Sequence, residues 1–162
     1  MSFLGRDTPI KIFQSEKELN ACMKQWQSYL GLEDWSMLAK LEDYIEDDSG
    51  RELSGQNQLE PINKTALIRI KDQRADKDAL EDNYLLTVCQ ECVLIHEMLH
   101  CKIGVIYNTS TYEGKTVDLR DHSDIEEWAR TLIAIAYDLP VRWYDNTETL
   151  IAINNAKEDE HK

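Results

Sequence analysis

The sequence lacks any run of about 20 apolar residues, the length that an α-helix needs to cross a bilayer. Its start, MSFLGRDTPIK, also lacks the basic head and long apolar stretch of a secretory signal. We therefore expect no membrane association and a cytoplasmic protein. Cysteine is scarce, and in that compartment Cys22, Cys89, Cys92 and Cys101 are expected to be free thiols.

Basic residues are also few: 18 Lys and Arg face 31 Asp and Glu, which gives a formal net charge of -13. A negative field of this size repels phosphate groups, so nucleic acid and anionic membranes are not expected as direct partners. Most of this charge is expected to be solvated surface, but it would favour a basic or extended peptide as a partner.

No internal repeat or low-complexity tract divides the chain. With 162 residues, of which 42% are hydrophobic, it is long enough for one domain with a real core and too short for two. We predict a single domain over 1–162, loose at 1–10 and 155–162, that is a monomer or a weak oligomer.

Helical signals mark three segments. Ser15 and Glu18 form a capping box for a first helix that ends at Gly31. A long helix is predicted from about 79 to 103, ended by Gly104, and a third from about 122 to 139, with Asp121 as N-cap and Pro140 just beyond. The inward positions of the first helix would be Leu19, Cys22, Met23, Trp26 and Leu30.

Alternating apolar residues predict strands near 35–45, in NQLEPI and in KTALIRI, where Ala66, Ile68 and Ile70 would share one face. Residues 105–121 read as a long loop or irregular hairpin, and 150–153 as a short final element. This order predicts an α+β fold with a small mixed or antiparallel sheet.

The stretch VLIHEMLHCKIG places two imidazoles and a carboxylate in an oily helix. His96 and His100, four residues apart, share one helical face and can bind one Zn²⁺, and Glu97 between them can reach a metal-bound water. This is the H-E-x-x-H pattern of metal hydrolases. Three polar groups in a buried helix are costly unless they are paired or bind a metal, which favours zinc over a helix of hydrogen-bonded core histidines.

A catalytic zinc needs a third protein ligand, for which HSDIEEWARTLIAIAYDL offers two adjacent glutamates. Glu126 heads an apolar stripe, whereas Glu127 falls on the polar side. Glu126 is therefore the predicted ligand and Glu127 the alternative, although both could simply be solvated acids near a helix N-terminus. The apolar stripe after Glu126 consists of Ala129, Leu132, Ile133 and Ala136.

The C-x-x-C of Cys89 and Cys92 offers a different metal site. Cys92 lies four residues before His96, but Cys89 and His100 are about 16 Å apart along a helix, so one ion cannot bind all of these side chains. A single C-x-x-C is weak support for structural zinc. We interpret the cysteines as small packing residues, with Cys92 as a neighbour of the site.

These residues resemble the small zincin-type metallopeptidases known as gluzincins, whose minimal single-domain members are common among phage and prophage proteins. The resemblance covers roughly residues 20–139 and rests on His96, Glu97, His100 and Glu126, with the E-x-x-A spacing from Glu126 to Ala129. It implies a zincin-like layout of N-terminal helix, small sheet, active-site helix and glutamate helix. It also implies that KTALIRI is the sheet edge beside the cleft, where a substrate peptide could add as a strand. The chain departs from the family in lacking a recognisable second lobe.

The predicted activity is zinc-dependent hydrolysis of a peptide or protein, with Glu97 as general base. Tyr107, Tyr112 and His122 are the candidates to stabilise the oxyanion. Two alternatives stay open: a catalytically weak or inactive metal-binding regulatory or adaptor protein of phage origin, and a metal-dependent hydrolase of other substrates.

Overall fold

Helix α1, at Glu16–Tyr29, begins where the capping residues predict. The computed structural model describes residues 4–72, 89–107, 111–112, 115–116 and 122–139. Ser15 Oγ accepts a hydrogen bond from the backbone N–H of Glu18 at 3.1 Å. Gly31 follows the helix with a φ of 68°, a left-handed conformation that glycine adopts without strain. The predicted inward positions Leu19, Cys22, Met23 and Trp26 are buried, and Leu30 packs against them.

Three strands form a mixed sheet in the order β1-β3-β2. Strand β1, at Ser36–Glu42, pairs in parallel with β3, at Thr65–Lys71. Strand β2, at Gly55–Glu60, is antiparallel to β3. The prediction near 35–45 is confirmed, whereas the strand predicted in NQLEPI begins two residues earlier and ends before Pro61, which has no backbone N–H for a ladder.

Strand β3 alternates as predicted, with Ala66, Ile68 and Ile70 buried on the helical side. The expectation that this strand is the sheet edge is wrong, because β3 pairs on both sides and is central. The edges are β1 and β2. Helix α1 covers the β1 edge: the Asn20 amide exchanges two hydrogen bonds with the backbone of Ala39, at 2.8 and 2.9 Å. Among the described residues, no strand pairs with the outer edge of β2, so this is the edge left for a partner strand.

Helix α2, at Gln90–Tyr107, contains the H-E-x-x-H stretch. The prediction that Gly104 ends this helix is wrong, because the helix continues for three more residues. A glycine inside a helix costs only about 1 kcal/mol, which the continuing backbone hydrogen bonds offset. Cys89 precedes the helix, and the predicted first part of this helix, residues 79–88, lies outside the described residues.

Helix α3, at His122–Tyr137, confirms the third predicted helix. Its proposed N-cap Asp121 and the predicted element at 150–153 lie outside the described residues. Two short strands lie between α2 and α3: β4, at Thr111–Tyr112, and β5, at Lys115–Thr116. They pair antiparallel, which agrees with the hairpin that was predicted as one alternative for 105–121.

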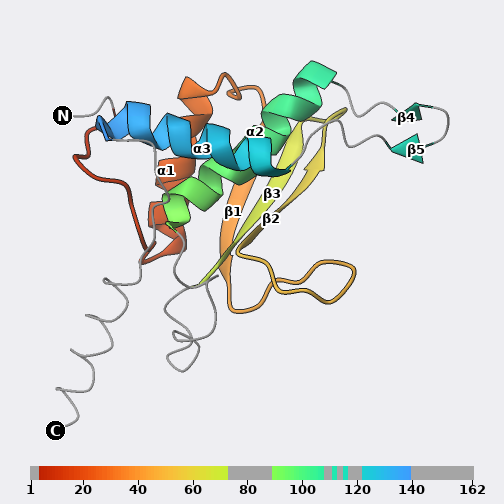
Figure 1. Ribbon diagram of the computed structural model, residues 1–162, viewed down its shortest axis with the longest axis horizontal. Helices are drawn as coiled ribbons and strands as arrows, with labels where there is room; N and C mark the ends of the chain where they lie inside the picture. The colour runs from red at the N-terminus through yellow and green to blue at the C-terminus, as the bar shows by residue number, and fades with distance from the viewer. Residues whose placement is uncertain (1–3, 73–88, 108–110, 113–114, 117–121, 140–162) are drawn as a thin grey trace, which may run out of the picture.

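The helices lie in layers on one side of the sheet. Helix α1 packs on β1 and helix α2 on β2 and β3, while α3 lies against α2 on the side away from the sheet (Figure 1). The α+β prediction is confirmed. Among the described helices, none is long and apolar enough to cross a membrane.

A buried carboxylate, Glu91, joins the helices near the start of α2. Its side chain is fully buried and accepts hydrogen bonds from Arg6 Nη2 at 3.1 Å, the backbone N–H of Ile10 at 3.1 Å and Trp26 Nε1 at 3.3 Å. The Tyr137 hydroxyl at the end of α3 is a fourth donor. These bonds connect α1, α2, α3 and the segment before α1, so Glu91 fixes how α2 and α3 cross.

Candidate metal and catalytic site

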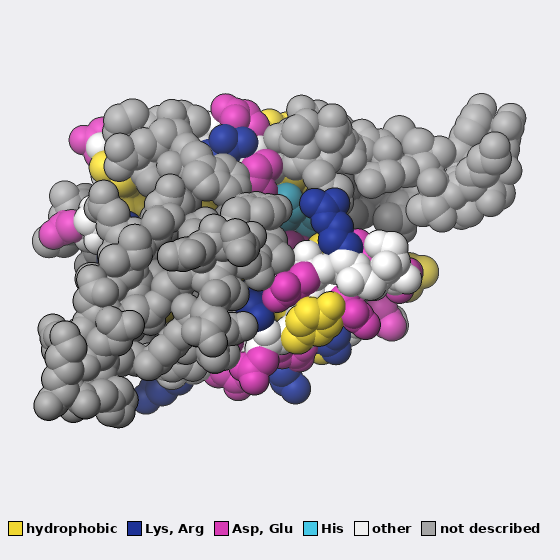
Figure 2. All heavy atoms as spheres, turned by 60° about the horizontal axis from the view of Figure 1, so that its bottom comes forward, with side chains coloured by type: hydrophobic (Ala, Val, Ile, Leu, Met, Phe, Trp, Pro, Cys, Tyr) yellow, Lys and Arg dark blue, Asp and Glu magenta, His cyan; other side chains and the backbone are white. Residues whose placement is uncertain are grey.

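Helix α2 presents His96 and His100 on one face. Their ring centroids lie 5.2 Å apart, as expected for residues separated by one helical turn. The helix holds them firmly because Leu94, Ile95 and Met98 around them are fully buried. Figure 2 shows histidine atoms reaching the surface with acidic and basic side chains near them. Both histidines are half-buried, and 11% of the His96 side chain is exposed.

Helix α3 brings Glu126 to this face. Glu126 Oε2 lies 2.7 Å from His96 Nδ1, whereas the Glu127 side chain is 59% exposed and approaches Arg130. The structure therefore places Glu126 toward α2 and Glu127 toward solvent, as the helical phase predicts. Burial lowers the pKa of His96, but the hydrogen bond to Glu126 and the charges of Glu97 and Glu126 outweigh it, so this pKa lies above its usual value.

Glu97 lies on the side of α2 that faces strand β2, where its Oε1 would be 3.3 Å from a Cβ atom on Gly55, and is only 7% exposed. Burial raises the pKa of its carboxyl to about 7; the nearby His96 acts in the opposite direction and Glu126 in the same one. Among the described residues, no group donates a hydrogen bond to this carboxyl. A buried acid without a donor is unusual in a stable core and is typical of functional sites.

The donors fit zinc in kind, because two imidazoles and a carboxylate are a common ligand set for a catalytic site. Within the described residues, no three His, Cys, Asp or Glu side chains are gathered into a group that could hold a metal ion. His96 and Glu126 instead form a direct contact of 2.7 Å. A metal held by both residues would have to replace this contact.

Three predicted oxyanion residues are placed only by their backbones. Tyr107 ends α2, Tyr112 lies in β4 and His122 begins α3. Their side chains lie outside the described part of the chain, so their role stays a prediction.

The cysteines are free and buried, as predicted. Burial raises the pKa of Cys89 to about 12 and that of Cys101 to about 11, and it also raises the pKa values of Cys22 and Cys92. Thiols of this kind are protonated at neutral pH, which favours a packing role over metal ligation or nucleophilic chemistry.

Two residues of β2 that the sequence does not single out contact the Glu97 turn. Asn57 donates a hydrogen bond to the Glu97 backbone carbonyl, and Gly55 lies directly against Val93 and Glu97. They are about 40 residues away along the chain, and no spacing rule connects them with H-E-x-x-H.

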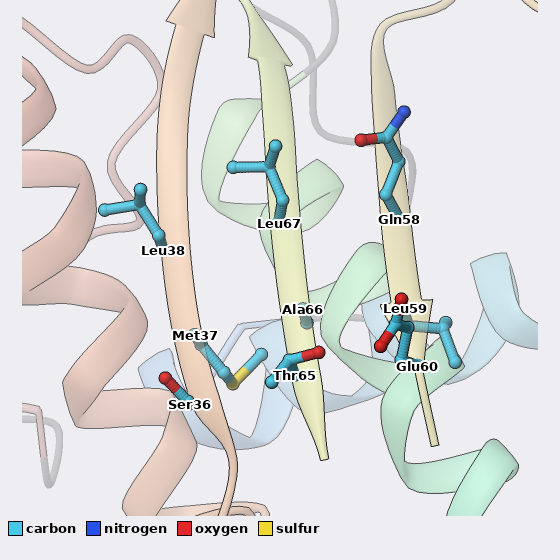
Figure 3. Close-up of a pocket in the computed structure, with 9 residues that line it drawn as sticks. All are labelled: Ser36, Met37, Leu38, Gln58, Leu59, Glu60, Thr65, Ala66 and Leu67. Carbon is cyan, nitrogen blue, oxygen red and sulfur yellow. The ribbon is translucent and has the colours of Figure 1, made fainter. Parts of the chain in front are cut away.

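A separate groove of about 570 Å³ lies over one end of the sheet. It is lined by 36–38 of β1, 58–60 of β2 and 65–67 of β3, and Leu38 and Leu67 stand side by side in it (Figure 3). It shares no residue with the candidate site. Compared with known protein families, curated proteins and solved structures, the chain matches none.

Proposed function

We propose that the chain is a zinc-dependent peptide-bond hydrolase of zincin-like layout. The observation that supports this best is Glu97: a buried carboxyl with no hydrogen-bond donor among the described residues, one position from His96 and within one turn of His100. His96, His100 and Glu126 would hold the metal. Bound zinc would acidify a water molecule and polarise the carbonyl of the substrate.

The residues of the chain would carry the proton. Glu97 takes a proton from the attacking water and transfers it to the departing amine, so that one water is consumed and an acid and an amine are formed. A pKa of about 7 suits both steps, because such a carboxyl can accept and release a proton near neutral pH. Zinc binding requires a neutral imidazole, so a bound metal would favour the neutral form of His96.

The outer edge of β2, with which no described strand pairs, is the proposed place for the peptide. In this antiparallel pair Ser54 faces Lys71 and accepts its hydrogen bond. Because the pattern alternates, the backbone groups of Gly55, Asn57 and Leu59 point away from β3. An extended peptide can pair with these groups beside Glu97, and the net charge of -13 would favour a basic one.

Zinc content and peptide cleavage test the proposal, measured for the parent protein and for Glu97→Gln. Both are expected to bind about one zinc, and only the parent is expected to cleave. Failure of the parent to take up added zinc would refute the proposal. Stoichiometric zinc without cleavage of any member of a peptide library, under any metal, would instead favour the regulatory or adaptor protein.

A further inference from the structure

Strand β2 approaches α2 most closely at Gly55. A Cβ atom at this position would lie 2.6 Å from Val93 Cγ1 and 3.3 Å from Glu97 Oε1. The first distance is far below normal contact, and valine in a helix has almost no rotamer freedom to retreat. A glycine is therefore what allows the strand to lie directly on the turn that carries the Glu97 carboxyl.

Two residues along, on the same face of β2, Asn57 makes a polar link to the same turn. Its Nδ2 donates to the Glu97 backbone carbonyl at 2.7 Å and lies 3.1 Å from Cys101 Sγ. Its Oδ1 is buried with no partner among the described residues. An apolar side chain at this position would not bury an unpaired acceptor. The buried Asn57 oxygen therefore costs stability, and the hydrogen bond made by the Asn57 nitrogen is what offsets this cost.

We propose that Gly55 and Asn57 are positioning residues for Glu97. Gly55 sets how near the strand can lie, and Asn57 fixes the strand to the helix at Glu97 itself. Together they hold the carboxyl at a fixed place beside the outer edge of β2. The consequence for turnover rests on the proposed function, whereas the contact itself does not.

The matched variants are Asn57→Ala and Gln58→Ala. Both remove a carboxamide from β2, but Gln58 is exposed and its side chain points to the opposite face of the sheet. In zinc-free protein, amide hydrogen exchange around 97–101 is expected to be about tenfold faster in Asn57→Ala and unchanged in Gln58→Ala. Equal exchange in the two variants would overturn the inference, whether or not the protein cleaves peptides.

Gly55→Ala tests the close approach, and Val93→Ala provides its rescue. The added methyl group should displace β2, lowering kcat by roughly a hundredfold, with zinc content and KM unchanged. Adding Val93→Ala removes the clashing methyl and should restore most of kcat. An unchanged kcat in both Gly55→Ala and Asn57→Ala would refute the positioning role. If the parent cleaves no peptide but the variants exchange amide hydrogens faster than the parent, the contact would be supported and the hydrolase proposal refuted.

Discussion

Replacing Glu97 with glutamine should stabilise the metal-free protein at pH 8. The folded pKa of about 7 exceeds the ordinary value of 4.5, so folding favours the protonated acid. The stabilisation of the folded state by the protonated Glu97 carboxyl is complete below pH 4.5. It declines as the pH rises and is lost above pH 7. The difference between these two pKa values corresponds to about 3 kcal/mol of stability that the parent loses at pH 8. A neutral amide of the same shape does not lose it.

The assay is thermal and urea unfolding in the presence of a chelator, at pH 5 and pH 8. For a chain of 162 residues, about 3 kcal/mol corresponds to a rise in Tm of roughly 6 to 12 °C at pH 8. At pH 5 the difference should fall to about 1 kcal/mol, because the acid is then protonated in the folded state and only the unfolded acid is ionised. Glu127→Gln, at a 59% exposed side chain, is the control and should change little at either pH.

Two results would refute this reasoning. A Glu97→Gln variant no more stable than the parent at pH 8 would mean that the carboxyl is not strained in the fold. A gain of equal size at pH 5 would mean that the amide stabilises through packing and not through loss of charge. The same variant should have no activity when loaded with zinc, so stability and function would change in opposite directions.

Three further outcomes are expected. Glu126→Ala should weaken zinc binding at least a hundredfold by metal titration, since loss of an outer-shell partner alone costs up to that much; a larger loss in Glu127→Ala would reverse the assignment. Glu91→Ala should lower the free energy of unfolding by about 3 kcal/mol or more in urea, because Arg6 and three other donors lose a buried partner; a loss below about 0.5 kcal/mol would contradict this role. The native protein should react slowly with an aromatic disulfide reagent at pH 8 and expose four thiols only on unfolding, because burial raises all four pKa values; fast reaction of a native thiol would contradict it.

The sequence predicts correctly those features of the fold that depend on residues close together in the chain. The Ser15 cap, the alternation in β3 and the inward phase of Glu126 each follow from residues within a few positions of one another. The errors arise where tertiary contacts decide. Gly104 is a good helix end in isolation, but α2 continues past it. The central place of β3 depends on which strands pair with it, which its own sequence does not encode.

In the candidate site, too, only the residues that lie close together in the chain could be predicted from the sequence. His96, Glu97 and His100 could be found from spacing alone, because a single helix positions all three. Gly55 and Asn57 could not, because their role arises only when β2 lies against α2. A glycine in a strand signals close backbone approach, but not what approaches.

The two buried glutamates of α2 show why one is structural and the other is the proposed base. Glu91 is fully buried, yet four donors surround its carboxyl, so its charge stabilises the crossing of the helices. Glu97, six residues later, is nearly as buried but accepts no hydrogen bond from a described residue, and its pKa rises to about 7. The same residue type on the same helix thus has different surroundings: four donors around Glu91, and none among the described residues around Glu97. A carboxyl that accepts no hydrogen bond from a described residue is able to exchange protons with a substrate, which is what the proposed reaction requires.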